Sequence, residues 1–240
     1  MRIAMWSGPR NLSTAMMYSF AARGDCAVWD EPFYAAYLIQ MGLPHPMAAE
    51  IIATHESDAA KVAAACSGPI PDGKPHYYLK VMPHQMLDGM PMGWAGDYVH
   101  VHLIRHPARV IASYGAKRDD QTLDDIGYAQ QLDLYQRLGG VVIDSHDIRE
   151  TPAAMMQALC DVISLPFTPA MLAWPAGGLP EDGVWARHWY GAVHSSTGFA
   201  GAEGPLPNMT QSQQILCDAA MPTYLQMRDR ALKPQKCGSR

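Results

Sequence analysis

The first fifteen residues constrain the fold of this chain more than any other stretch. Arg2 to Trp6 form an apolar strand pattern, which passes through the loop SGPRNLST into a helical pattern at Ser13 to Ala22. A glycine-containing loop between a strand and a helix start brings backbone N–H groups and the helix dipole to one point. This order of elements predicts an α/β fold with an anion site near its beginning.

The loop differs from an ATP-binding loop at a decisive position. A Walker A loop reads GxxxxGK[ST], whereas here Gly8 is followed four residues later by Leu12, Ser13 and Thr14, with no lysine before the hydroxyls. Arg10 supplies the positive charge of the loop, and a planar guanidinium can hold two oxygens of a phosphate or sulfate at once. The loop therefore indicates an oxyanion ligand. The alternative interpretation is a polar helix start without a ligand.

The rest of the chain alternates short apolar runs with longer helical patterns. We expect strands at 27–29, 77–82, 98–104 and 141–145, and helices at 34–66 with a break at 42–46, at 121–138, at 152–163 and at 212–232. The alternation predicts a three-layer α/β fold with a mostly parallel central sheet flanked by helices. We expect residues 1–240 to form a single domain, in which a Pro- and Gly-rich loop at about 168–210 covers the site.

Composition narrows the class of partner. A net charge of −5 and a pI near 6.0 give no general electrostatic reason to bind nucleic acid or an anionic membrane. No apolar run approaches the ~20 residues of a membrane span, and no signal-peptide pattern precedes the first strand. We therefore expect a cytoplasmic protein with a small-molecule partner. Its scattered cysteines lack a CxxC pair and are expected to be reduced thiols: Cys26, Cys66, Cys160, Cys217 and Cys237.

A second segment, LIRHPARVIASYGAKR, reads as strand, turn and helix. Arg105 leaves the fourth strand, and Ser113 lies eight residues later, two turns along the helix. Open α/β sheets bind ligands at the carboxyl ends of their strands, so Arg105 and the Arg10 loop are expected to face one crevice. The alternative is an amphipathic helix on which Arg105, Arg109 and Lys117 are simply solvated.

Together these segments resemble the sulfotransferases that use 3′-phosphoadenosine 5′-phosphosulfate (PAPS). The family's R-x-P-x-x-x-x-x-S segment matches Arg105 through Ser113, and VVIDSHDIRETPAAMMQALCDVISLPF resembles its strand, turn and LGLPF ending. The order and spacing agree over about residues 1–170, and CDAAMPTYLQM resembles the C-terminal helix of bacterial members. The family's loop P-[RK]-[SGN]-x-[ST]-[ST] matches Pro9, Arg10, Asn11, Leu12, Ser13 and Thr14.

The resemblance implies a P-loop NTPase-like fold and metal-free transfer of a sulfuryl group from PAPS to a hydroxyl or amine of a small-molecule or carbohydrate acceptor. It implies that Gly8 to Thr14 hold the 5′-phosphosulfate and that Arg105 and Ser113 hold the 3′-phosphate. Arg10 would stabilise the charge that gathers on the leaving phosphate. Leu12 departs from the family, because many members have glycine there, and a bulky side chain could restrict the loop.

Two residues at strand ends are candidates for the base that takes the acceptor's proton. Glu31 lies in WDEPF, which resembles the E-P turn of carbohydrate and bacterial sulfotransferases, and we favour it slightly. His84 lies in KVMPHQM, near where cytosolic members carry a histidine two residues after a lysine, but that position here is Met82. The structural alternatives are a helix-capping carboxylate for Glu31 and a half-buried loop histidine for His84.

Three further features indicate a function less specifically than the loop and the Arg105 segment do. His100 and His102 share one strand face, but no third and fourth ligand follow at zinc spacing, so we predict no metal site. Trp185, Trp189 and Tyr190 are expected to cap the core. Ser195 to Gly198 offer hydroxyls and a flexible hinge that could close over the donor.

Two other functions remain open from the sequence. One is a small-molecule kinase or other P-loop phosphotransferase, which the missing Walker lysine disfavours. The other is a non-catalytic nucleotide-binding module of the same fold, which Leu12 and the displaced His84 make credible.

Overall fold

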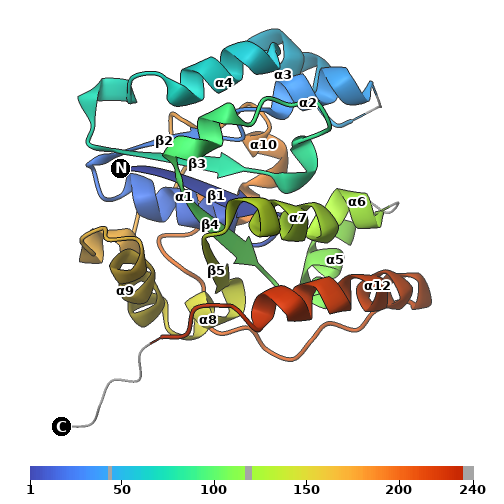
Figure 1. Cartoon of the computed structure of the whole chain (residues 1–240). Coiled ribbons are helices and arrows are strands. Elements are labelled where there is room, and N and C mark those ends of the chain that lie inside the picture. Colours follow the sequence, from blue (N-terminus) through green and yellow to red (C-terminus); the bar gives the residue numbers. More distant parts are fainter. Residues whose placement is uncertain (43–44, 117–120, 235–240) are drawn as a thin grey trace, which may run out of the picture.

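The computed structural model describes residues 1–42, 45–116 and 121–234. Its strands are β1 (Arg2–Ser7), β2 (Cys26–Asp30), β3 (His76–Val81), β4 (Val99–Ile104) and β5 (Val141–Asp144). They form one sheet in the order β2-β3-β1-β4-β5, and each neighbouring pair is parallel (Figure 1). The predicted α/β fold with a parallel central sheet is confirmed.

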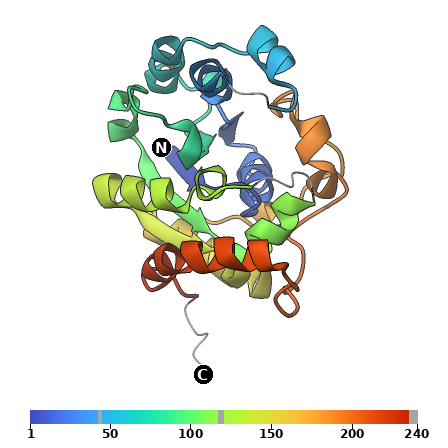
Figure 2. The ribbon, with the colours of Figure 1, turned by 90° about the vertical axis from the view of Figure 1, so that its right-hand side faces the viewer.

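Helices connect and cover these strands. The α-helices are α1 (Ser13–Ala21), α2 (Tyr34–Met41), α3 (Ala48–Thr54), α4 (Ala59–Ser67), α5 (Pro107–Gly115), α6 (Leu123–Ile126), α7 (Tyr128–Leu138), α8 (Ser145–Glu150), α9 (Pro152–Val162), α10 (Ala186–Trp189), α11 (Gly191–His194) and α12 (Gln211–Arg228). Short 3₁₀ turns are η1 (Pro71–Gly73), η2 (Pro83–Gln85), η3 (Gly93–Asp97) and η4 (Pro169–Leu172). Figures 1 and 2 both show α2, α3 and α4 on the side of the molecule opposite to α12.

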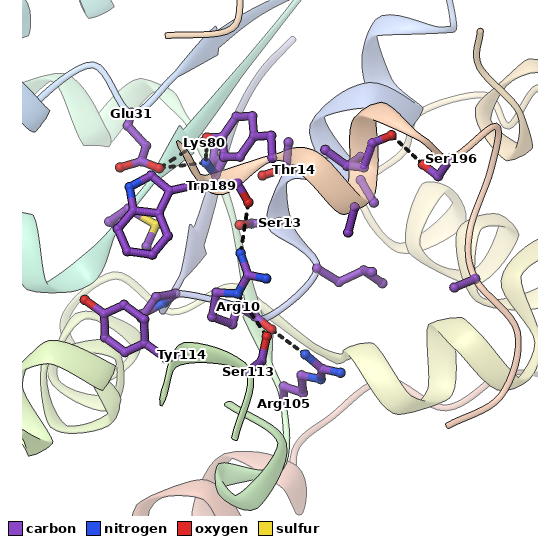
Figure 3. A pocket seen from close by; sticks show the side chains of 18 of the residues that line it. Arg10, Ser13, Thr14, Glu31, Lys80, Arg105, Ser113, Tyr114, Trp189 and Ser196 are labelled. Atoms are coloured by element: carbon purple, nitrogen blue, oxygen red, sulfur yellow. Dashed lines mark hydrogen bonds and ion pairs between the residues drawn. The ribbon is translucent and has the colours of Figure 1, made fainter. Parts of the chain in front are cut away.

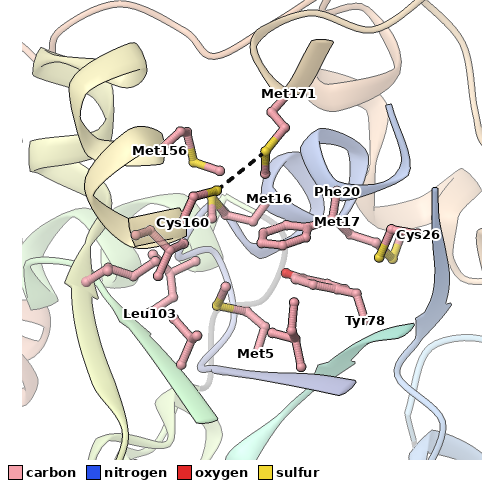
Figure 4. Packing of buried hydrophobic residues seen from close by; sticks show 14 of the residues in the cluster. Met5, Met16, Met17, Phe20, Cys26, Tyr78, Leu103, Met156, Cys160 and Met171 are labelled. Carbon is pink, nitrogen blue, oxygen red and sulfur yellow. Dashed lines mark hydrogen bonds between the residues drawn. The ribbon is translucent and has the colours of Figure 1, made fainter. Parts of the chain in front are cut away.

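Alternating side chains of β1 divide the core into two layers. Ile3 and Met5 point to one face of the sheet, where α1 and α9 pack with a methionine-rich set of side chains (Figure 4). Ala4 and Trp6 point to the other face, where they meet α4, η3 and Leu134 of α7. Burial on both faces explains why the strands read as continuous apolar runs.

The register brings the carboxyl ends of three strands to one level. Trp6 of β1 pairs with Val81 of β3, and Ser7 pairs with Leu103 of β4, so these strands end at one level. The loops that follow them therefore open side by side at the carboxyl edge of the sheet, which is where such folds bind ligands.

Several predicted elements differ in detail from the structure. The helix predicted over 34–66 is divided into α2, α3 and α4, and Asp58 starts α4 by accepting hydrogen bonds from the Ala60 and Lys61 amides. The predicted break at 42–46 includes residues 43–44, which lie outside the described residues. The helix predicted over 121–138 is divided at Gly127, whose φ of 70° ends α6.

The late Pro- and Gly-rich segment is more regular than the prediction of a long loop, since η4, α10 and α11 lie within it. The C-terminal helix α12 continues through Pro222.

The described cysteines are free and buried, whereas Cys237 lies outside the described residues. Within the described ranges, no helix is both long and apolar enough to cross a bilayer.

Candidate active site

A cavity of about 350 Å³ opens at the carboxyl edge of the sheet (Figure 3). Its wall comes from the loop after β1, the ends of β2 and β3, the residue after β4, the last turn of α5 and the late segment. Residues predicted as site residues that line it are Pro9, Arg10, Leu12, Ser13, Thr14, Glu31, His84, Arg105 and Ser113. Sequence positions more than a hundred apart therefore meet in one hollow.

Gly8 and Asn11 do not line the cavity, although both were predicted to bind the donor. A Cβ at Gly8 would lie 2.7 Å from the Ile126 carbonyl oxygen, so this position requires glycine for close packing. Asn11 is buried and donates from Nδ2 to the Leu103 carbonyl at 3.2 Å, which ties the loop to β4. Both residues shape the loop, and their contact with a donor stays a prediction.

Three residues that line the cavity have a left-handed backbone conformation. Arg10, Leu12 and Glu31 have φ values of 62°, 81° and 42°, and all three line it. Such conformations are costly for residues with a Cβ, and they cluster at functional sites where the surrounding structure holds them. The φ of Leu12 explains why glycine suits this position in many sulfotransferases. Leu12 adopts the turn that glycine adopts freely, and its side chain packs partly buried against the core.

Arg10 is held across the cavity by two groups from distant segments. Its Nε donates to Ser113 Oγ at 3.0 Å, and its Nη1 donates to the Trp189 carbonyl at 3.1 Å (Figure 3). Burial, followed by the nearby charge of Arg105, lowers the pKa of Arg10. This desolvated cation beside the start of α1 is a strong site for an anion, because low local dielectric strengthens its field.

Arg105 is a partner of the same loop and is not a simply solvated charge. Its Nη1 donates to the Arg10 carbonyl at 2.7 Å, and its Nε donates to Glu203 Oε1 at 3.0 Å. Arg109 and Arg149 also pair with Glu203, at 3.0 Å and 2.8 Å. The structure thus rejects the interpretation of Arg105 and Arg109 as solvated charges and places three guanidinium groups around one carboxylate. Lys117 lies outside the described residues.

Lys80 is the centre of a second polar cluster. It is 1% exposed at the end of β3, and its Nζ lies 2.8 Å from Asp30 Oδ1 and 2.7 Å from Glu31 Oε1. Nζ also donates to the Tyr190 hydroxyl at 2.5 Å, and that hydroxyl donates to Asp30 Oδ2 at 2.7 Å. Burial lowers the pKa of Lys80, but the two carboxylates outweigh burial and raise it. Lys80 therefore carries its charge inside the protein.

Replacing Lys80 by methionine is expected to reduce the free energy of unfolding by about 3–5 kcal/mol, because Asp30 and Glu31 would remain as uncompensated buried carboxylates. Urea unfolding measures this loss. Lys61→Met is the matched control, since Lys61 is exposed and its change should stay within about 0.5 kcal/mol. Adding Asp30→Asn to Lys80→Met should restore part of the loss, and an equal or larger loss in the double variant would contradict this interpretation.

His84 lines the cavity with a packed ring. It meets Tyr37 edge to face at 5.5 Å, and burial lowers its pKa to about 4. His84 is therefore neutral at neutral pH.

Glu31 is held on both oxygens, because Oε1 pairs with Lys80 and Oε2 accepts from Gln85 Nε2 at 2.6 Å.

The remaining sequence candidates have structural partners. Trp6 Nε1 donates to His100 Nδ1 at 3.1 Å, and His102 Nε2 lies 3.0 Å from the Gly139 carbonyl. Ser195 donates to the Gly191 carbonyl at 2.6 Å, and Ser196 donates to the Val193 carbonyl at 2.7 Å. Ser196 and Gly198 nevertheless line the cavity, so the predicted closing segment lies at its wall.

Sequence reasoning missed several residues of the site. Lys80 had a usable signal, since a lysine inside the apolar run YYLKV is unusual in a strand buried on both faces. Tyr190 was expected only to cap the core, and no local pattern indicates that its hydroxyl joins a buried ion pair. Arg149 and Glu203 had no local signal, because only the fold brings them to Arg105.

Comparisons with known proteins agree with this geometry. The chain matches the family described as "Sulfotransferase domain" over residues 1–231. It is 35% identical over 229 residues to "Branched-chain-amino-acid aminotransferase-like protein 2" of Arabidopsis thaliana, and 35% identical over 230 residues to the corresponding protein 1. Each alignment covers 92% of this chain but 40% of the plant protein, so the chain spans less than half the length of these relatives.

One solved structure shows a similar fold. The "Sulfotransferase Domain from the Synechococcus PCC 7002 Olefin Synthase" matches with a TM-score of 0.51 and 19% identity, covering 92% of this chain and 94% of that one. The "Sulfotransferase Domain from the Curacin Biosynthetic Pathway" matches with a TM-score of 0.48 and 14% identity, covering 91% and 96%.

Proposed function

This chain belongs to the sulfotransferase domain family, and we propose that it transfers a sulfuryl group from PAPS to a hydroxyl or amine of a small-molecule or carbohydrate acceptor. One observation carries the proposal. The loop that contains Arg10 and the segment from Arg105 to Ser113 resemble the two halves of a PAPS site, and hydrogen bonds join them across one cavity.

The cavity suits a donor with two separated anionic groups. At one end, Arg10 lies beside Ser13 and Thr14 at the start of α1, where helix N–H groups face outward. At the other end, Arg105 and Arg149 already hold a carboxylate, so this end accepts an anion. PAPS carries its phosphosulfate and its 3′-phosphate on opposite sides of one ribose, which matches two such ends.

In this proposal the protein stabilises charge on the phosphate that leaves the sulfuryl group. Arg10 donates to that phosphate, and the hydroxyls and amides of Ser13 and Thr14 hold it in place. Arg105 and Ser113 hold the 3′-phosphate and so distinguish PAPS from ATP. The existing bond from Arg10 to Ser113 keeps these two parts in a fixed relation before the donor arrives.

Glu31 is the base that we propose for the acceptor's proton. It lies at the end of β2 with a strained backbone, and Lys80 and Gln85 fix both of its oxygens. When a buried carboxylate accepts a proton, a charge is removed, whereas a proton on His84 would create a charge that burial disfavours. Aromatic side chains of Tyr34, Tyr114 and Trp189 complete the cavity wall and would contact the acceptor.

Calorimetric titration with 3′-phosphoadenosine 5′-phosphate (PAP), the product of the donor, tests this proposal. We expect PAP to bind without a metal and more tightly than AMP, because only PAP reaches Arg105. Arg105→Ala should weaken PAP binding by roughly 10- to 150-fold, which corresponds to a charge-assisted hydrogen bond of about 1.5–3 kcal/mol. AMP binding should change little.

Arg137→Ala is the matched control, because Arg137 is exposed and pairs with Asp133 on α7. It should leave both affinities unchanged. A preference for ATP with magnesium would favour the kinase alternative, and equal binding of PAP and AMP would contradict a 3′-phosphate site at Arg105.

A further inference from the structure

Glu203 is a buried charge outside the proposed catalytic groups. Its side chain is 1% exposed, although it belongs to a segment without regular structure between α11 and α12. Arg105 directly follows β4, Arg109 lies in α5 and Arg149 lies in α8, and all three point to its carboxylate. Burial raises the pKa of Glu203, but these arginines outweigh burial and lower it. Glu203 is therefore a buried anion held by three cations.

The segment around Glu203, which we call the strap (residues 200–206), depends on the same arginines. Arg149 Nε donates to the Gly201 carbonyl at 2.8 Å, and Arg109 donates to the Gly204 carbonyl. Within the described part of the chain, the strap makes no backbone-to-backbone hydrogen bond. Its attachment to the protein is therefore mainly electrostatic.

The strap lies against the proposed donor site. Arg105 and Arg149 line the cavity, and so does Ala200 of the strap. On the proposed function, Arg105 holds the donor's 3′-phosphate, yet in this structure Arg105 holds Glu203. One guanidinium cannot make its strongest contacts to both anions at once, because each occupies the same fork of donors.

We infer that Glu203 is an internal stand-in for the donor's 3′-phosphate, that Arg149 and Arg109 belong to the 3′-phosphate pocket, and that donor binding displaces Glu203 and releases the strap. This inference rests on the proposed PAPS function. It extends that function, because it adds two recognition residues and a competing anion that the loop motifs do not indicate.

Charge balance favours the exchange. Three guanidinium groups carry three positive charges, and among the described ion pairs Glu203 returns only one negative charge to them. A phosphate monoester carries about −1.5 to −2 at pH 7 and offers three acceptor oxygens. The 3′-phosphate therefore matches the cluster better than a carboxylate does, and Glu203 keeps the arginines ordered until the donor arrives.

Competition from Glu203 reduces the apparent affinity for the donor, because the donor binds only those protein molecules in which Glu203 has left the arginines. Glu203→Gln removes the charge of the competitor and keeps its shape. We expect this variant to bind PAP about tenfold more tightly than the natural chain, while AMP, which has no 3′-phosphate, binds with unchanged affinity. Arg149→Ala should weaken PAP binding and leave AMP binding unchanged.

Glu56→Gln is the matched control. Glu56 also pairs with a basic side chain, but it is exposed and does not line the cavity. It should change neither affinity. Limited proteolysis of the natural chain provides a second measurement that needs no variant. A glutamate-specific protease should cleave after Glu203 faster once PAP is added, because the Glu203 side chain is 1% exposed while the arginines hold it.

The outcomes separate the inference from the proposed function. If the natural chain binds PAP but Glu203→Gln binds it equally or more weakly, or if the strap becomes protected by PAP, the inference is wrong and the donor site stands. If neither protein binds PAP, the donor proposal fails and the inference fails with it. PAP binding by Glu203→Gln alone would support both.

Discussion

An Arg10→Ala protein is expected to fold normally and to lose turnover by about 10²- to 10³-fold, the loss typical of removing one preorganised donor to a developing anion. Arg10 lies in the loop directly before α1, and it is already oriented by Ser113 and the Trp189 carbonyl. No reorganisation is needed when charge develops on the leaving phosphate. A sulfuryl-transfer assay at saturating donor measures kcat directly.

The same variant distinguishes an enzyme from a binding module. An enzyme should lose kcat more than donor affinity, because the contact strengthens in the transition state. A non-catalytic module would lose only affinity for PAP. Arg187→Ala serves as a control of the same chemistry, since Arg187 pairs with Glu50 at an exposed position on α10. Unchanged kcat in Arg10→Ala would contradict the role proposed for this residue.

The parts of the fold that sequence reasoning predicted well are those with local causes. Apolar runs bounded by loops predicted the strands, because strands buried on both faces need apolar residues at most positions. The helix boundaries were predicted less well. Gly127 ends a helix through its left-handed backbone, and Asp58 starts one by capping two amides, and a helical pattern across 34–66 or 121–138 does not reveal such local features.

For the site too, sequence reasoning succeeded where the cause is local and failed where it depends on the folded structure. Pro9 to Thr14 could be predicted because strand, loop and helix are adjacent in sequence, and Arg105 could be predicted because parallel strands end at one edge. Leu12 could not be interpreted, since its left-handed φ is a property of the folded loop. Glu203 lies 98 residues from Arg105, and no periodicity connects positions so distant.

The buried pair of Lys80 and Glu31 links stability to the proposed chemistry. Lys80 holds Asp30 as well as Glu31, so replacing Glu31 alone leaves this lysine paired. The Glu31→Gln chain is therefore expected to fold, whereas loss of the lysine leaves two carboxylates without a counter-ion. This asymmetry allows the carboxylate of Glu31 to be removed for a kinetic test without dismantling the cluster.

Glu31→Gln is expected to lower kcat by about 10²- to 10⁴-fold, the contribution of a positioned general base. His84→Gln is the comparison, and its effect should stay below about tenfold, since the His84 ring is packed on Tyr37 and burial opposes its protonation, with a pKa of about 4. Both variants should keep PAP affinity, because neither side chain belongs to the proposed phosphate contacts.

The ratio of the two losses identifies the base. A large loss in His84→Gln together with a small loss in Glu31→Gln would transfer the role to His84 and leave Glu31 as a partner of Lys80. Small losses in both would mean that proton removal does not limit turnover, and acceptors with a less acidic hydroxyl would then test the base again, since they depend on it more strongly. Only a loss confined to Glu31→Gln supports the carboxylate at the end of β2 as the group that accepts the proton.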